Sequence, residues 1–173
     1  MGRFKIVTVV PAYNEEKTII NVIKELKNCS DIIIVDDDSD DETFELAKKN
    51  NTILIKNPEN LGYEKSLQIG LFKAIELNYD FAITFDADGQ HKTSDFKKFE
   101  NLIESGYDLI LGNRSYIERF SEKIGKIIFF RKWGIKDPFC GFKAYNLKKM
   151  KEFNFFERYK SVGTDLSLSF IKK

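Results

Sequence analysis

The sequence predicts an α/β fold in which a mostly parallel sheet is flanked by helices on both faces. Short runs of β-branched apolar residues alternate with longer segments whose apolar residues recur at helical spacing. The runs are apolar throughout, as in strands that are buried on both faces. Polar and sharply turning residues follow these runs, at the edge where open α/β sheets bind their ligands.

Each element can be placed along the chain. The expected strands are residues 6–10, 32–35, 52–55, 81–85 and 108–111. Asn14 is expected to cap a first helix, and Ser39 with Glu42 is expected to form the capping box of a second. Further helices are expected at Tyr63–Leu77, around Phe96–Ile103 and at Phe120–Trp133. After residue 115 the alternation of strands and helices loosens.

The bulk composition excludes several classes of protein. The chain of 173 residues fits one domain spanning 1–173. Its 28 basic and 27 acidic residues leave a net charge of +1, which argues against a general nucleic-acid binder. Cys29 and Cys140 lack a metal-ligand spacing and are expected to be reduced thiols. Because the sequence has no signal-peptide pattern and no apolar run of membrane length, we expect a cytoplasmic protein, attached at most peripherally to the cytoplasmic membrane face.

Asp86 and Asp88 directly follow an expected strand and are separated by one residue. This spacing lets two carboxylates reach one cation, and hard oxygen ligands suit Mg²⁺ or Mn²⁺ bound to substrate phosphates. Gln90 would add an oxygen, and His91 would suit Mn²⁺ better than Mg²⁺. Taken alone, the motif favours the alternative of a solvated turn around Gly89.

Polar residues also follow the first and second expected strands. Asp37 belongs to a polar run at 36–41 that exceeds what helix capping needs, and it is expected to accept hydrogen bonds from a nucleobase or ribose. Asp36 is expected to face inward. Tyr13 would stack on a base. The alternatives are that the acids cap the following helix and that Tyr13 is a surface aromatic.

Four motifs follow one another along the chain: Val9–Glu16, Val35–Ser39, Asn60–Gly62 and Asp86–His91. In order and spacing they resemble the large family-2 glycosyltransferases. Two more motifs, Gly112–Arg114 and Asp137–Lys143, look like the subgroup that contains dolichol-phosphate mannose synthases and bacterial polyprenyl-phosphate sugar transferases. The resemblance covers nearly the whole chain.

The resemblance implies a GT-A (Rossmann-like) fold and an inverting transfer of a sugar from a nucleoside-diphosphate sugar. The matching nucleotide-sugar positions are Pro11, Tyr13, Glu15, Val35, Asp37, Asp86, Ala87, Asp88 and Arg114. The matching metal positions, for Mg²⁺ or Mn²⁺, are Asp86, Asp88 and Gln90. Arg114 matches a basic residue near the diphosphate, where a cation stabilises the negative charge of the leaving group. The expected catalytic residues are Asp88, Arg114 and Asp165.

The acceptor decides whether a base is needed. A polyprenyl (dolichyl or undecaprenyl) phosphate is already ionised, whereas a hydroxyl acceptor needs a carboxylate such as Asp165 or Asp137 to take its proton. Phe120–Trp133 interleaves basic and large apolar residues, which suits a helix on anionic lipid as well as an ordinary helix packed on the sheet. The resemblance favours a lipid-phosphate acceptor at the membrane surface.

Two alternative functions stay open at this stage. One is transfer to a soluble hydroxyl acceptor, and the other is a nucleotide-sugar-binding accessory chain without catalysis. A nucleotidyltransferase is disfavoured because the first strand is not followed by a glycine-rich, basic phosphate loop.

The sequence departs from the family pattern in two places. Asp38 stands where the family usually has Gly, and Asp tolerates the left-handed backbone that such a turn needs. Relatives continue beyond the region of Asp165 with another basic segment, whereas this sequence ends at Lys173. We therefore expect full activity to require a compensating residue, an acceptor that needs less enclosure, or another chain, either a second copy or a membrane partner subunit.

Overall fold

The computed structural model describes residues 4–89, 93–113, 120–152 and 164–171. Its centre is a six-stranded sheet with the strand order β3-β2-β1-β4-β6-β5. The strands are β1 (Ile6–Ala12), β2 (Asp31–Asp36), β3 (Ile53–Lys56), β4 (Phe81–Thr84), β5 (Leu109–Leu111) and β6 (Lys143–Asn146). β1 pairs in parallel with β2 and β4, and β2 pairs in parallel with β3.

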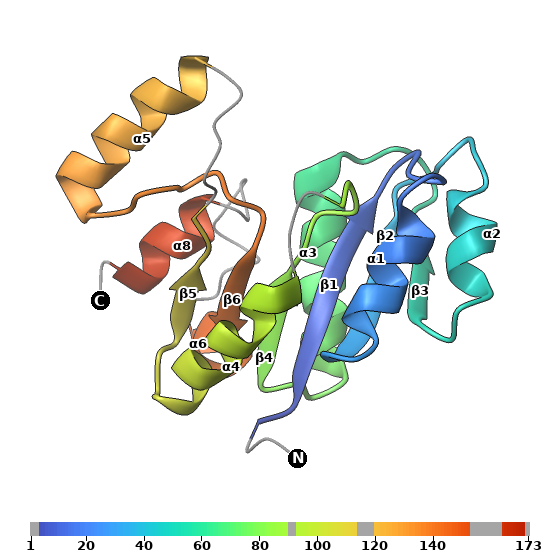
Figure 1. Cartoon of the computed structure of the whole chain (residues 1–173), viewed down its shortest axis with the longest axis horizontal. Coiled ribbons are helices and arrows are strands. Elements are labelled where there is room, and N and C mark those ends of the chain that lie inside the picture. The colour runs from blue at the N-terminus through green and yellow to red at the C-terminus, as the bar shows by residue number, and fades with distance from the viewer. Residues whose placement is uncertain (1–3, 90–92, 114–119, 153–163, 172–173) are drawn as a thin grey trace.

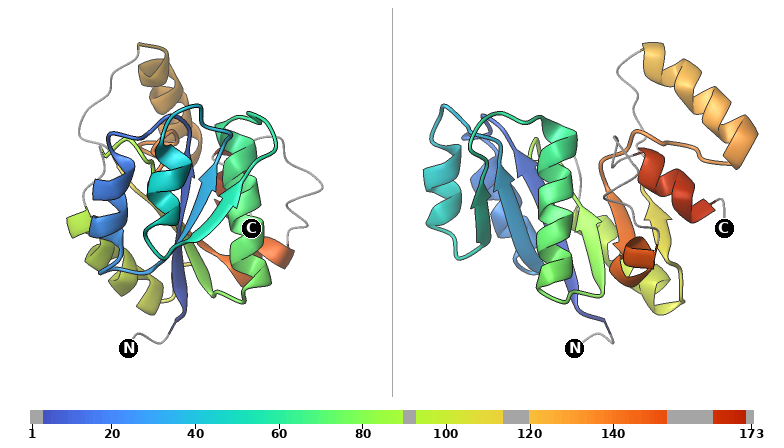
Figure 2. Two further views of the ribbon diagram at one scale, coloured as in Figure 1. Left: turned by 90° about the vertical axis from the view of Figure 1, so that its right-hand side faces the viewer. Right: turned by 180° about the vertical axis from the view of Figure 1, so that it is seen from behind.

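Helices cover both faces of this sheet (Figures 1 and 2). The helices of the described residues are α1 (Ile19–Leu26), α2 (Thr43–Lys48), α3 (Tyr63–Glu76), α4 (Phe96–Glu104), α5 (Phe120–Trp133), α6 (Leu147–Glu152) and α8 (Thr164–Ile171), and a short 3₁₀ turn, Thr93–Asp95, precedes α4. α5 projects beyond the β5–β6 side of the sheet (Figure 1). The predicted fold class, a mostly parallel sheet flanked by helices on both faces, is confirmed.

Two apolar cores, one on each face of the sheet, hold the layers together. On one face α1 and α4 bury residues such as Ile23 and Phe99 against β1, β2 and β4. On the other face α3 buries Leu67 and Leu71 against the same strands. α3 lies close to the sheet because Gly70 faces Val9 and Val35, where a Cβ would overlap the Val9 side chain. The sheet is therefore buried on both sides, as its apolar runs require.

β6 is a strand that the sequence did not predict, and the helix α6 that follows it was not predicted either. β6 lies between β4 and β5 and runs antiparallel to both. Its residues Lys143–Asn146 are neither β-branched nor alternating, so they lack the usual pattern of a strand. Because β6 runs antiparallel, it begins at the edge where β4 ends, and Lys143 pairs with Thr84. This brings the preceding segment, Asp137–Phe142, to the edge that was expected to carry the site.

The predicted helix caps are wrong in detail. α1 begins at Ile19 rather than after Asn14, and Asn14 has a left-handed φ of 56°. The Asn14 side-chain oxygen accepts a hydrogen bond from the Asp40 amide, and the Ser39 hydroxyl accepts one from the Asn14 amide. Neither residue caps its own helix, because each joins the loop after β1 to the loop after β2. By contrast, Asp38 has the left-handed backbone expected of it, with a φ of 59°.

Within the described residues, no helix has both the length and the apolar character needed to span a membrane.

Candidate active site

A pocket of about 320 Å³ lies at the carboxyl ends of β1, β2 and β4. Its walls come from the loop after β1, the end of β2, the turn before α3 and the segment after β4. The lining residues are Pro11, Ala12, Tyr13, Glu15, Asp37, Asn60, Gly62, Tyr63, Ser66, Asp86, Ala87 and Asp88. Residues that are distant in sequence meet here because parallel strands present their carboxyl ends at one edge.

Asp37 is buried and holds the turn Asn60–Gly62 in place. One carboxylate oxygen accepts hydrogen bonds from the Asn57 side chain at 2.6 Å and the Leu61 amide at 2.9 Å, and the other accepts one from the Gly62 amide at 2.8 Å. Burial opposes ionisation of this carboxyl, but these hydrogen bonds outweigh burial and lower its pKa. Asp37 is therefore an ionised residue that shapes one wall of the pocket.

Asp86 is held from two sides. The Tyr63 hydroxyl donates a hydrogen bond to one of its carboxylate oxygens at 2.8 Å. On the other side the carboxylate lies against Gly141, where a Cβ would overlap it. Asp86 therefore has a defined orientation at the end of β4, and a side chain at position 141 would disturb it.

Asp88 is exposed and lines the same pocket as Asp86. Two carboxylates of this kind fit a divalent cation that also binds phosphate oxygens. Among the described residues no group of three His, Cys, Asp or Glu side chains forms a complete metal site. Gln90 and His91, the other expected contributors, lie outside the described residues.

Two buried lysines hold the segment Asp137–Phe142 in place. Lys126 of α5 forms an ion pair of 3.0 Å with Asp137, and both side chains are buried. Lys143 donates a hydrogen bond of 2.9 Å to the Pro138 carbonyl. Burial lowers the pKa of Lys143 to about 8, although nearby anionic groups oppose the shift. These contacts fix the backbone that carries Gly141 to Asp86.

A model of the protein family described as "Glycosyl transferase family 2" matches residues 7–164. The chain belongs to this family. Its family-2 motifs are those that converge on the pocket, so the family match and the geometry identify the same edge of the sheet.

Several curated proteins are similar to this family-2 chain. A UDP-N-acetylglucosamine–dolichyl-phosphate N-acetylglucosaminyltransferase of Methanococcus voltae is 39% identical over 126 residues, covering 61% of this chain and 50% of that protein. A dolichol-phosphate mannosyltransferase of Pyrococcus furiosus is 28% identical, covering 81% of this chain and 46% of that protein. The chain thus spans about half the length of these relatives.

Solved structures confirm the GT-A fold. A glucosyl-3-phosphoglycerate synthase from Mycobacterium tuberculosis, crystallised with Mn²⁺, UDP-glucose and glycerol 3-phosphate, has a TM-score of 0.67 and 21% identity, covering 84% of this chain and 58% of that one. A mannosyl-3-phosphoglycerate synthase from Rubrobacter xylanophilus has a TM-score of 0.71 and 17% identity, covering 84% and 54%. At these identities the likeness concerns the fold alone.

The other residues predicted for this family-2 site have different positions. Val35 is fully buried in the apolar core and does not line the pocket, so its side chain cannot contact a nucleotide. Asp137 is buried and paired with Lys126, which makes it a poor general base. Arg114 lies outside the described residues, as does the side chain of Asp165 at the start of α8. Asp36 faces inward as expected and accepts a hydrogen bond from the Ser39 amide.

Five residues of the pocket were not among the predicted site residues. Ala12, Asn60 and Gly62 belong to the motifs, whereas Tyr63 and Ser66 lie outside all of them. Both belong to the first turn of α3, directly after the motif Asn60–Gly62. The motif indicated that this segment reaches the site, but the helical spacing of α3 gave no sign that its first turn faces the pocket.

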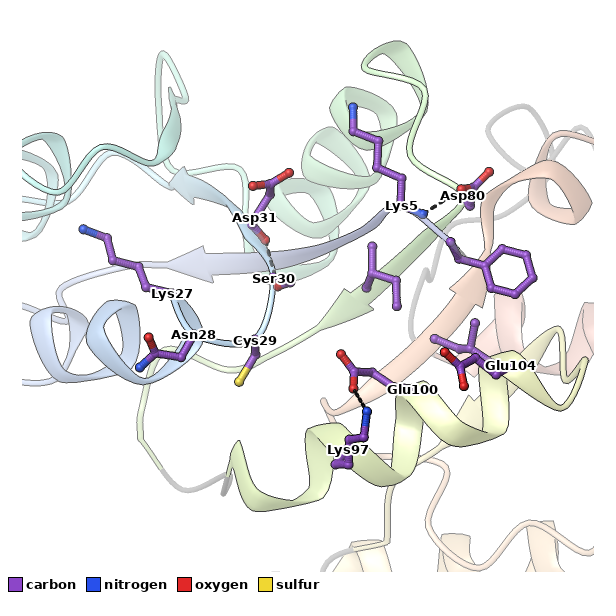
Figure 3. Close-up of a pocket in the computed structure, with 13 residues that line it drawn as sticks. Lys5, Lys27, Asn28, Cys29, Ser30, Asp31, Asp80, Lys97, Glu100 and Glu104 are labelled. Carbon is purple, nitrogen blue, oxygen red and sulfur yellow. Dashed lines mark hydrogen bonds and ion pairs between the residues drawn. The ribbon is translucent and has the colours of Figure 1, made fainter. Parts of the chain in front are cut away.

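A larger hollow of about 900 Å³ lies at the opposite, amino-terminal edge of the sheet (Figure 3). It contains charges of both signs, and Lys97 pairs with Glu100 at 2.9 Å. The Lys5 amide donates a hydrogen bond to the Asp80 carboxylate. Among the described residues, none of the predicted site residues lines it. The candidate site is therefore the smaller pocket, on which the motifs converge.

Proposed function

We propose that this chain binds a nucleoside-diphosphate sugar together with Mn²⁺ or Mg²⁺ and transfers the sugar, with inversion, to a polyprenyl phosphate. The observation that carries the proposal is the convergence of Tyr13, Asp37, Asp86 and Asp88 on one pocket at the carboxyl edge of the sheet. Relatives named as dolichyl-phosphate and undecaprenyl-phosphate sugar transferases support the class of acceptor.

The donor half of the site follows from the pocket walls. Tyr13 is 44% exposed and offers a ring on which a nucleobase can stack. Asp37 acts through the turn that it holds, since its oxygens accept hydrogen bonds from that turn. Asp86 and Asp88 would hold the metal, which when bound neutralises charge on the diphosphate leaving group. UDP-glucose and Mn²⁺ in the complex of the M. tuberculosis synthase support this type of donor and cofactor.

The acceptor half is argued from proton chemistry. A lipid phosphate is ionised at neutral pH and attacks the sugar carbon without a general base. Asp137, one of the two candidate bases, is buried against Lys126 and already paired. That pairing disfavours Asp137 as the base that a hydroxyl acceptor would need.

α5 supports access to a membrane surface. Ile127 and Phe130 are 57% and 55% exposed, and Arg131 and Lys132 beside them are exposed cations. Exposed apolar residues next to cations suit the headgroup region of an anionic bilayer. We expect the protein to sediment with anionic vesicles, and equal sedimentation with neutral vesicles would contradict this assignment.

The experiment incubates the purified chain with a panel of UDP-, GDP-, CDP- and dTDP-sugars, a polyprenyl phosphate, and Mn²⁺ or Mg²⁺. Metal-dependent formation of a lipid-linked sugar is expected, and Asp88→Asn should lower it at least about 100-fold. Asp95→Asn is the matched control, because Asp95 takes part in an exposed ion pair with Lys98 and does not line the pocket. Unchanged transfer by Asp88→Asn would overturn the mechanism, and nucleotide binding without transfer to any acceptor would favour a non-catalytic accessory chain.

A further inference from the structure

Tyr63 connects the start of α3 with Asp86 in the proposed donor site. It is the first residue of α3, and its hydroxyl donates the 2.8 Å hydrogen bond to Asp86. The same side chain lines both the 320 Å³ pocket and a second hollow of about 110 Å³, which Lys143 and Gly141 also line. Tyr63 thus lines both hollows, and its hydroxyl contacts a carboxylate that lines the larger one.

The backbone that carries Tyr63 is fixed by Asp37. Both Asp37 oxygens accept amide hydrogen bonds from the turn, at Leu61 and Gly62. Gly62 has a φ of 88°, a left-handed conformation that glycine adopts without strain, and its carbonyl accepts a hydrogen bond from the Ser66 amide. A continuous series of hydrogen bonds therefore runs from the end of β2, through the turn and Tyr63, to the end of β4.

The Tyr63 hydroxyl is a permanent donor in this position. Tyr63 is 44% exposed as a whole residue, and its hydroxyl is directed at the Asp86 carboxylate. A tyrosine hydroxyl, with its ordinary pKa of about 10, is protonated throughout the neutral range, so it donates to Asp86 rather than repelling it.

We infer that Tyr63 is a positioning residue that pre-orients Asp86 for the divalent cation and couples this carboxylate to the nucleotide side of the pocket. The inference rests on the proposed function, because it assigns a role within the same site. The Tyr63 hydroxyl on one side and Gly141 on the other leave Asp86 little rotational freedom. Because the Asp86 side chain is already ordered, it loses less conformational entropy when the cation binds, and the cation binds more tightly.

The expected effect falls on the metal rather than on the fold. Tyr63→Phe removes the hydroxyl and keeps the ring. We expect the Mn²⁺ concentration that half-saturates nucleotide binding to rise roughly tenfold, as for the loss of one hydrogen bond to a charged group. At saturating Mn²⁺ the nucleotide affinity should return to within about twofold of the wild type, since the turn that shapes the pocket is retained.

The test first selects the nucleoside diphosphate that the wild type binds best among UDP, GDP, CDP and dTDP. Mn²⁺ is then titrated into the protein with that nucleotide, and free Mn²⁺ is followed by its electron paramagnetic resonance signal. Tyr107→Phe is the matched control, because Tyr107 is 57% exposed and lies outside both pockets. Tyr63→Ala is added to separate the hydroxyl from the ring.

Equal tenfold rises for Tyr63→Phe and Tyr63→Ala, with none for Tyr107→Phe, would support the inference. A rise confined to Tyr63→Ala would overturn it, because the ring alone would then account for the effect. An unchanged Mn²⁺ midpoint in Tyr63→Phe would overturn it as well. If the wild type bound no nucleotide in a Mn²⁺-dependent way, the proposed function itself would fail, a result distinguishable from either outcome in the variants.

Discussion

At the scale of single residues, the site depends on how its carboxylates are held as much as on their presence. The sequence predicted Asp37, Asp86 and Asp88 as site residues, and all three line the pocket. It did not predict their partners, because Tyr63 and Gly141 reach Asp86 from segments 23 and 55 residues away in the chain. Such contacts follow from the tertiary fold and leave no local pattern in the sequence.

Gly141→Ala tests the close approach of the backbone to Asp86. The new methyl group would overlap the Asp86 carboxylate, and the carboxylate can move away because it ends a flexible side chain. We expect metal-dependent nucleotide binding to weaken about tenfold or more, while the free energy of unfolding changes by less than about 1 kcal/mol. Calorimetric titration and urea unfolding measure the two quantities. Wild-type binding in this variant would show that Asp86 needs no fixed orientation.

Asp37→Asn tests the turn before α3. The amide cannot accept all the hydrogen bonds that the carboxylate accepts, so we expect a loss of about 1–3 kcal/mol of stability at pH 7. The pKa of Asp37 is lowered in the folded state, so its contribution is complete above the unfolded pKa of about 3.9 and is lost as the pH falls through the folded value.

The difference between wild type and Asp37→Asn should therefore shrink below about pH 4. Urea unfolding at pH 7 and pH 3 measures it. A difference that is the same at both pH values would show that the ionised carboxylate is not what stabilises the turn.

At the scale of elements, the sequence predicted the strands β1 to β5 and the helices that pack on them, but not β6. The apolar runs of β1 and β2 are strong sequence signals for strands. Lys143–Asn146 lacks such a signal, and it is a strand through its pairing with β4 and β5. The helix starts were also displaced, since Asn14 and Ser39 bind each other's loops. A capping motif predicts a hydrogen bond between neighbouring residues of one segment. Here the same side chains form hydrogen bonds between two loops instead.

The buried pair of Lys126 and Asp137 joins α5 to the segment before β6, and its removal tests that connection. Lys126→Met leaves the Asp137 carboxylate buried without its cation, so we expect a loss of about 3–5 kcal/mol. Lys126→Met combined with Asp137→Leu should recover most of the loss, because both charges of the pair are then removed together.

Urea unfolding of the two single variants and the double variant measures this coupling. Additive losses in the double variant would contradict the account, since they would mean that the two side chains do not interact.

At the scale of the whole molecule, strand direction determines at which edge of the sheet the candidate site residues meet. β1, β2 and β4 end at one edge, and the antiparallel β6 begins there, so Asp37, Asp86 and the segment that carries Gly141 meet. The larger hollow at the opposite edge contains none of the predicted site residues that the structure describes. The sequence predicted that these residues would meet at this edge, since parallel strands present their carboxyl ends together, and the structure brings them together there. The identities of the base, sugar and acceptor depend on side chains brought together from many segments, and these stay predictions.

The most direct test of the central claim is a calorimetric titration of the wild type and Asp88→Asn with UDP and GDP, in Mn²⁺ and again in EDTA. We expect one nucleotide to bind the wild type in Mn²⁺, with affinity at least about tenfold lower in EDTA and in Asp88→Asn with Mn²⁺. Equal affinity with and without Mn²⁺, or in the wild type and Asp88→Asn, would contradict a metal–diphosphate site at Asp86 and Asp88.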